Sequence, residues 1–213
     1  MPLQCGTQWD ALSHIVHDGK IYNGYEASLV SSKGALKNDI AQARDRVVSR
    51  GVLLDVARYR KKSWLEPGEA ITGEDLEGCC RAEGLKISPG DIVLVRTGQM
   101  GRVKSEGRWN AYAGGPAPGL GLSAAPWIYR SEIASLATDT WGAEGLPKET
   151  EDVFQPLQIV CIVYMGLLLG EIFDLEALAE DCARDGVYEF FFVSHPLPIT
   201  RAVGSPINPL AIK

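Results

Sequence analysis

Two short runs of apolar residues constrain the fold of this chain most strongly. Residues 51–57 read GVLLDVA, and residues 91–97 read DIVLVRT after the turn-forming sequence SPG. Apolar runs of this length are typical of strands that are buried on both faces, as in a largely internal sheet. We expect further strands at residues 133–139 and 187–195.

The segments between these strands favour helices. Thr72 followed by Asp75 is the pattern of a helix N-cap with an acidic third position, and it predicts a helix that runs to about Arg81 and stops near Gly84. The apolar segment 158–169 is also predicted to be helical. Strands that alternate with helices indicate an α/β domain, with a mixed sheet and flanking helices.

Caps and turns mark the remaining boundaries. Ser123 and Asp174 are expected to cap two further helices, because short polar side chains accept hydrogen bonds from the first free backbone N–H groups. The pairs Asp18-Gly19 and Asn23-Gly24 predict turns. The glycine-rich segment 114–121 has neither of the common phosphate-binding patterns, so it is predicted to be a surface loop.

Composition argues against several classes of protein. The chain has 213 residues and a net charge of −6, and its basic residues are scattered. Its charge therefore gives no electrostatic reason to bind nucleic acid or an acidic membrane surface. Its most apolar stretch, 159–169, is too short to span a bilayer. The five cysteines contain no CxxC spacing, which indicates reduced and mainly buried thiols. We therefore expect a cytoplasmic protein.

A polar segment near the start, CGTQWDALSH at 5–14, raises the question of a site. If residues 4–10 form a strand, Gln4, Gln8 and Asp10 share one face, because side chains two apart point the same way. His14 follows just past that strand. This pattern fits a metal site or a water-activating site, and it equally fits an ordinary polar edge strand.

Histidine is too scarce for a zinc site made of several imidazoles, since the chain holds only three. Carboxylate and amide oxygens remain, and these donors suit Mn²⁺ or Mg²⁺. Glu171 follows the apolar YMGLLLG, where a carboxylate is costly unless it is paired or coordinated. Each residue also has a structural alternative, in which a glutamine is a simple hydrogen-bond partner, Asp10 a turn cap and His14 a structural histidine. The candidate donors are Gln4, Gln8, Asp10, Gln158 and Glu171.

Three further residues are candidates for contact with a substrate. Arg96 ends a predicted strand, where α/β proteins often bind ligands, or else it is a buried ion-pair partner. Trp9 and Trp109 are candidate walls of a pocket, although core packing explains such tryptophans as well.

The segment 6–14, GTQWDALSH, resembles the GTHxDxxxH signature of the metal-dependent cyclase family. The similarity continues along the chain in GVLLDV, GDIVLVRTG, PGLGLSAAPWI, ATDTWG, GEIFDLEALA and YEFFFVSHPLPI. The resemblance implies a cyclase-like, swivelling β/β/α domain. It also implies that Asp10 is a metal ligand, that Glu171 is a ligand from a distal helix, and that His14 transfers protons.

Two departures from the family accompany this resemblance. The family's early histidine ligands fall on Gln4 and Gln8, and a later one falls on Gln158. Because an amide oxygen is a weaker and harder donor than imidazole, we expect lower affinity and a preference for Mn²⁺ or Mg²⁺, with Zn²⁺ as a further candidate. The family also has an N-terminal region before the signature, so 1–213 is expected to be a single cyclase-like domain that lacks this region. The sheet edge and apolar patch exposed in this way favour a homo-oligomer.

These observations favour a metal-dependent hydrolase that acts on a small cyclic or acyl amide or ester. In this hypothesis, His14 takes a proton from water and returns it to the leaving amine or alkoxide. The alternative is a truncated, non-catalytic homologue that acts as a binding or subunit-interface protein. For the hydrolase the expected partner is a small-molecule substrate, with no nucleic acid and no membrane.

Overall fold

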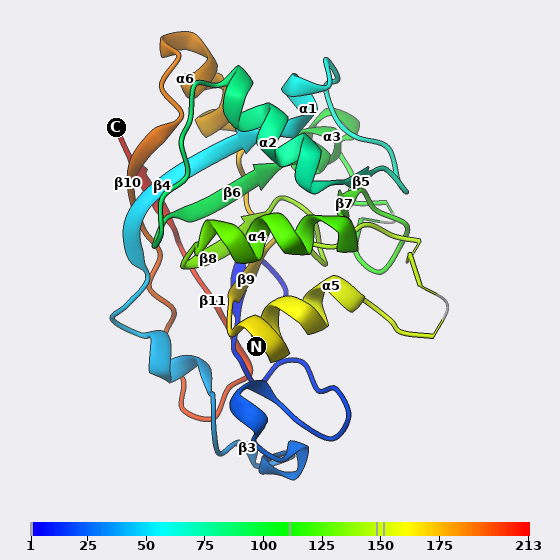
Figure 1. The fold of residues 1–213 in the computed structure, drawn as a ribbon, viewed down its shortest axis with the longest axis vertical. Helices are drawn as coiled ribbons and strands as arrows, with labels where there is room; N and C mark the ends of the chain where they lie inside the picture. Colours follow the sequence, from blue (N-terminus) through cyan, green and yellow to red (C-terminus); the bar gives the residue numbers. More distant parts are fainter. Residues whose placement is uncertain (1, 111, 148, 151) are drawn as a thin grey trace.

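An eight-stranded mixed sheet lies at the centre of the computed structural model, which describes residues 2–110, 112–147, 149–150 and 152–213 (Figure 1). In the order in which they lie side by side, its strands are β11 (Gly204–Pro206), β1 (Gln8–Asp10), β9 (Leu168–Glu171), β8 (Ser135–Thr138), β6 (Ile92–Arg96), β4 (Val48–Asp55), β10 (Glu189–Val193) and β12 (Leu210–Ile212). The predicted α/β class is confirmed.

Four central strands of the sheet are parallel. Neighbouring strands among β4, β6, β8 and β9 run in the same direction, and pairs such as Leu53 with Leu94 fix their register. The flanking strands β1 and β10 run antiparallel to β9 and β4. The apolar runs therefore form the buried middle of the sheet, as predicted, and strands are confirmed within 133–139 and 187–195.

The strand expected over residues 4–10 is shorter than predicted. It covers Gln8–Asp10 alone, because its neighbours β11 and β9 offer few residues to pair with. Gln8 stands opposite Pro206, which has no N–H group to extend the ladder.

Helices cover both faces of the sheet. They are α1 (Val56–Tyr59), α2 (Gly73–Ala82), α3 (Gln99–Glu106), α4 (Ala125–Ser131), α5 (Pro156–Gln158), its continuation η5 (Ile159–Met165) with π-helical geometry, and α6 (Glu176–Asp185). The N-cap of α2 is confirmed, since the Thr72 hydroxyl accepts from the Asp75 N–H and the Asp75 carboxylate accepts from the Thr72 N–H. Within the described residues, no helix is long and apolar enough to cross a bilayer.

Two predicted caps are wrong. Ser123 lies inside the short 3-10 turn η4 (Leu122–Ala124), which leads directly into α4, so Ala124 takes the N-cap position. The N-cap of α6 is Leu175, and the Asp174 carboxylate accepts a long hydrogen bond of 3.4 Å from the Glu176 N–H.

The helix predicted over 158–169 is also partly wrong. The helical segment ends at Gly166, whose φ of +71° is left-handed and whose Cβ, if present, would lie 2.3 Å from the Tyr22 ring. The chain then becomes extended and enters β9, where it pairs with β8 and β1. Glu171 therefore ends a strand, and the prediction that it extends from a distal helix is wrong.

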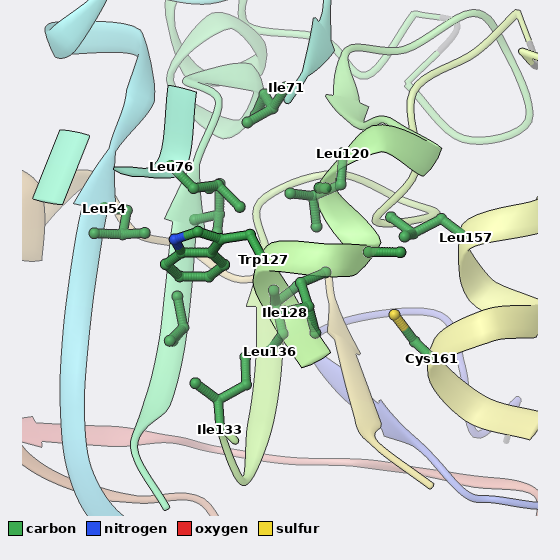
Figure 2. Packing of buried hydrophobic residues seen from close by; sticks show 14 of the residues in the cluster. Leu54, Ile71, Leu76, Leu120, Trp127, Ile128, Ile133, Leu136, Leu157 and Cys161 are labelled. Atoms are coloured by element: carbon green, nitrogen blue, oxygen red, sulfur yellow. The ribbon is translucent and has the colours of Figure 1, made fainter. Parts of the chain in front are cut away.

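Each face of the sheet has its own hydrophobic core. On the face covered by α2, α4 and α5, Trp127 packs among residues that include Leu54 and Leu76 (Figure 2). On the other face, Trp9 and Phe190 pack with residues of α6. The five cysteines are free thiols, and all except Cys5 are buried, as predicted.

Short elements connect these layers. They are η1 (Tyr22–Gly24), η2 (Ala27–Leu29), η3 (Ile40–Ala43), and the strand pairs β2 (Val30–Ser31) with β3 (Gly34–Ala35) and β5 (Ala70–Ile71) with β7 (Gly119–Leu120). The predicted turns at Asp18 and Asn23 are present, and both residues have positive φ.

Candidate active site

The register of β1 against β9 brings three polar side chains together. Gln8 stands opposite Glu171 in the ladder, and Asp10 lies two residues further along the same face of β1. All three are buried, with exposed fractions of 2% for Gln8, 0% for Asp10 and 6% for Glu171. The two-residue periodicity of a strand therefore places Gln8 and Asp10 together, as the sequence predicts.

Glutamine amides connect the two carboxylates. Gln8 Nε2 donates to Asp10 Oδ1 at 3.3 Å and to Glu171 Oε2 at 3.0 Å. Gln158, the last residue of α5, donates from Nε2 to Glu171 Oε1 at 3.2 Å and to the carbonyl oxygen of Gly142 at 2.6 Å. The cluster is thus built from an N-terminal strand, a central strand and a helix.

Gln4 and His14 lie on the outer side of this cluster. Gln4 Nε2 donates to Asp10 Oδ1 at 2.6 Å and lies 3.2 Å from His14 Nδ1. His14 Nε2 lies 3.9 Å from Asp10 Oδ2, and the His14 side chain is 27% exposed. His14 is held by the turn after β1, where its N–H donates to the Ala11 carbonyl oxygen. The imidazole therefore lies between the buried carboxylates and solvent.

Burial controls the electrostatics of the two carboxylates. Desolvation raises the pKa of Asp10, although the charge of His14 and the hydrogen bonds from Gln4 and Gln8 act in the opposite direction. Desolvation, together with the negative charge of Asp10, raises the pKa of Glu171 to about 9. Two acids that are this costly to ionise together favour the uptake of a positive charge, either protons or a cation.

The donor chemistry of the cluster fits a hard divalent cation. Gln8 Oε1 and Asp10 Oδ2 are buried oxygens for which the described residues supply no hydrogen-bond partner. The available donors are carboxylate and amide oxygens, which suit Mn²⁺ or Mg²⁺ better than Zn²⁺. In the part of the chain that the structure describes, no group of three or more His, Cys, Asp or Glu side chains forms a metal site, so any cation here depends on glutamine oxygens.

A cavity of about 140 Å³ is lined by residues of α3, the segment after it and the segment after β8. Trp109, Tyr112 and Thr140 line it, and the Thr140 carbonyl oxygen accepts from the N–H of Ile172, the residue after Glu171. The charge of Glu171 contributes, after burial and Asp139, to a raised pKa of Tyr112. The cavity is therefore connected to the cluster through the backbone contact of Thr140 with Ile172, and its described lining residues lie outside the cluster.

The predicted substrate residues take different places. Trp109 lines the cavity and is exposed, with its ring edge-on to Tyr112. Trp9 is fully buried in the core on the far side of β1, where its indole N–H donates to the backbone carbonyl and hydroxyl of Ser194. Arg96 is a buried ion-pair residue, the structural alternative, since it donates to Asp55 at 2.8 Å and to both oxygens of Glu176.

Sequence reasoning missed two contributors to this region. Tyr112 lines the cavity and donates to the Asp139 carbonyl oxygen at 2.8 Å, but its position three residues after Trp109 is its single sequence signal. The Gly142 carbonyl, which holds Gln158, is a backbone group and leaves no signal in side-chain patterns.

Comparison with known proteins agrees with this architecture. Residues 1–145 match a family model described as Cyclase, putative cyclase. A solved structure described as a novel cyclase aligns with 100% of this chain and 71% of its own, at 37% identity and a TM-score of 0.91. No curated protein matches the chain. The expected cyclase-like fold is confirmed.

Two more distant solved structures share the fold. An isatin hydrolase A from Labrenzia aggregata bound to benzyl benzoate is 22% identical, with a TM-score of 0.68 over 97% of this chain and 72% of that chain. A predicted metal-dependent hydrolase from Bacillus stearothermophilus is 20% identical, with a TM-score of 0.58 over 99% of this chain and 78% of that chain. At these identities the likeness shows the fold alone.

Proposed function

Because this chain belongs to the cyclase family, we propose that it is a metal-dependent hydrolase that cleaves a small cyclic or acyl amide or ester. The observation that carries the proposal is the convergence of Asp10 and Glu171 on one buried cluster, two of whose oxygens find no hydrogen-bond partner among the described residues. The solved structures described as an isatin hydrolase and a predicted metal-dependent hydrolase, which share its fold, support the same class of reaction.

The residues that would hold the cation are Asp10 and Glu171, assisted by the amide oxygens of Gln4, Gln8 and Gln158. Mn²⁺ and Mg²⁺ are favoured over Zn²⁺, because the donors at these three positions are amide oxygens rather than imidazole nitrogens. When bound, such a cation polarises the substrate carbonyl and lowers the pKa of a nearby water.

His14 would act as the general base and general acid. Its ring is partly exposed and lies next to Asp10, so it can take a proton from the attacking water and exchange protons with solvent. The same ring then returns a proton to the leaving nitrogen or oxygen. The Asp10 carboxylate, 3.9 Å from His14 Nε2, would help to orient the ring.

The cavity beside Trp109 and Tyr112 would hold the body of the substrate. Its volume of about 140 Å³ limits the occupant to a small molecule or to one part of a larger one. Aromatic walls favour a flat, apolar group next to the carbonyl that is attacked.

Replacing His14 tests the proposal. We expect His14→Asn to lower Mn²⁺-dependent hydrolysis of a panel of aryl formamides and lactones by about a hundredfold to ten-thousandfold. Its affinity for Mn²⁺, measured by electron paramagnetic resonance, should stay near the wild-type value. The matched control is His17→Asn, since His17 is partly exposed and bonds to Tyr164 outside the cluster. Equal activity of the two variants would contradict the role of His14, and loss of Mn²⁺ in His14→Asn would make it a ligand.

The second candidate function is that of a non-catalytic homologue. The hydrogen bonds favour it in one respect, because the amide nitrogens of Gln4, Gln8 and Gln158 already donate to both carboxylates, and only Asp10 Oδ2 is left without a partner among the carboxylate oxygens of the described cluster. The two functions differ in metal linkage. A ligand at a hundred times its Kd stabilises the folded state by about 2.7 kcal/mol, so a hydrolase of this kind should melt at a higher temperature in Mn²⁺. An unchanged melting temperature would favour the non-catalytic homologue.

A further inference from the structure

Glu144 is a buried carboxylate beside the cluster that the proposed reaction does not use. Its side chain is 2% exposed. Its Oε2 accepts hydrogen bonds from the backbone N–H groups of Leu157 at 2.8 Å and Gln158 at 3.1 Å. These N–H groups lie in the first turn of α5, which otherwise starts without a side-chain cap among the described residues.

The turn that carries Glu144 also holds the side chain of Gln158. The Gly142 carbonyl oxygen accepts from Gln158 Nε2 at 2.6 Å and also from the N–H of Glu144. Ala143, between them, has a φ of +52°, the left-handed conformation of a tight turn. One three-residue turn therefore fixes both the backbone and the amide of Gln158.

Neighbouring residues pack closely against this turn. A Cβ on Gly142 would lie 3.0 Å from Gln155 Nε2, and a Cβ on Gly119 would lie 2.6 Å from the Glu144 backbone carbon. From this fixed position, Gln158 Nε2 reaches Glu171 Oε1 at 3.2 Å. The chain of contacts runs from Glu144 through Gln158 to Glu171 without a gap.

We infer that Glu144 is a positioning residue, whose carboxylate holds the start of α5 so that the Gln158 amide is fixed against Glu171. The effect on hydrolysis rests on the proposed function, but the effect on Gln158 does not. One oxygen is sufficient for this role, because Oε2 accepts both hydrogen bonds while Oε1 finds no partner in the described chain. A glutamine at 144 can supply that oxygen, whereas an alanine cannot.

Nuclear magnetic resonance of the full chain without metal tests the inference directly. The probes are the side-chain NH₂ signals of Gln158, identified by their loss in Gln158→Ala, and the exchange rates of the Leu157 and Gln158 backbone amides. In Glu144→Ala we expect the NH₂ signals to move to the values of exposed glutamines and the two amides to exchange at least about tenfold faster. In Glu144→Gln both readouts should stay near wild type. The control is Glu149→Gln, an exposed acid that accepts from the Leu122 N–H and should change neither readout.

Each outcome decides the question. Unchanged Gln158 signals in Glu144→Ala would overturn the inference, and so would equal changes in the alanine and glutamine variants, because the charge would then matter rather than the position. Should Glu144→Ala fail to fold, Glu144→Asp replaces it, since its shorter side chain keeps the charge but cannot reach both N–H groups, and it should release Gln158. With an active enzyme, Glu144→Ala and Glu144→Asp should lower kcat with little change in KM, whereas Glu144→Gln should keep the wild-type kcat. An inactive wild type would count against the proposed function and leave the resonance result to decide the role of Glu144.

Discussion

A fully buried carboxylate with a free oxygen is the feature of Asp10 that most needs an explanation. Among the residues that the structure describes, Asp10 Oδ2 has no hydrogen-bond partner, and burial raises the pKa of the carboxyl group. Such a group destabilises the folded state unless it is protonated or meets a cation. Residues of this kind persist where function requires them, which is consistent with a ligand role for Asp10.

Replacing Asp10 should therefore separate stability from metal binding. We expect Asp10→Asn to raise the free energy of unfolding in metal-free buffer by about 1 kcal/mol, because an amide removes the buried charge and keeps the hydrogen-bond acceptor. The same variant should show no Mn²⁺-induced rise in melting temperature. Urea unfolding and thermal melts with and without Mn²⁺ give both quantities, and Asp18→Asn, a change of an exposed acid, is the control. A less stable Asp10→Asn that still responds to Mn²⁺ would contradict this account.

Part of the site could be predicted from single residues. The spacing of Gln8 and Asp10 is enough to place them on one strand face, and Gln4 reaches Asp10 although it lies outside the strand. Gln158 and Glu171 were candidate donors by residue type and, for Glu171, by its apolar surroundings, but their place in one site with Asp10 followed from the resemblance to a family. No local pattern links Gln8 to Glu171, which lie 163 positions apart in sequence. Trp9 could not be assigned to a pocket or to the core from sequence. Strand alternation does not tell which face of β1 packs against the hydrophobic core that contains Phe190 and residues of α6.

At the scale of elements, the apolar runs at 51–57 and 91–97 predicted buried strands correctly, whereas one of the three predicted helix caps, Thr72, is confirmed. Thr72 and Asp75 satisfy each other within one turn, so the start of α2 follows from the sequence alone. The segment 158–169 was mistaken for one helix, because an apolar run does not distinguish a buried helix from a buried strand. Gly166 divides it, and the Tyr22 ring, which leaves no room for a Cβ at this position, is a long-range feature that sequence patterns do not show.

The C-terminal end of α2 should make stability depend on pH. Glu83 Oε1 accepts from the Asp55 N–H at 3.0 Å, and burial raises the pKa of Glu83 to about 7. Since the ordinary value is 4.5, the folded state binds this proton more tightly than the unfolded state. The stability that the protonated form provides is complete below the ordinary pKa and is lost as the pH rises through about 7.

Glu83→Gln should remove this dependence. We expect the variant to match wild type near pH 5 and to exceed its free energy of unfolding by about 1 to 3 kcal/mol at pH 8. Urea unfolding across that range measures the difference, with Glu74→Gln, an exposed position on the same helix, as control. A difference between Glu83→Gln and wild type that does not grow with pH would refute the assignment.

At the scale of the whole molecule, the two edges of the sheet differ. The residues of β11 are mostly buried and end in Pro206, whereas all three residues of β12 are exposed. Ile212 stands opposite Phe191, and the two side chains are each 53% exposed. An apolar edge strand of this kind is a common surface for pairing with another chain. Which strands form the two edges could not be predicted from sequence, because the short sequence GSP of β11 has no strand signal.

The expected homo-oligomer stays a prediction, and β12 is the surface that fits it best. We expect wild type to sediment as a dimer or larger at micromolar concentration, and Ile212→Lys to shift this equilibrium towards the monomer, because a charge at the edge opposes strand pairing. The control is Leu36→Lys, which changes a side chain that is 54% exposed outside the sheet. Identical sedimentation of wild type and Ile212→Lys would exclude this edge as the interface.

In the proposed hydrolase, Asp10 and Glu171 share one divalent cation with the help of glutamine oxygens. Anomalous diffraction from crystals soaked in Mn²⁺ tests it most directly. We expect a Mn²⁺ peak that contacts both carboxylates and at least one of Gln4, Gln8 and Gln158. Fully soaked crystals with no peak between Asp10 and Glu171 would contradict it.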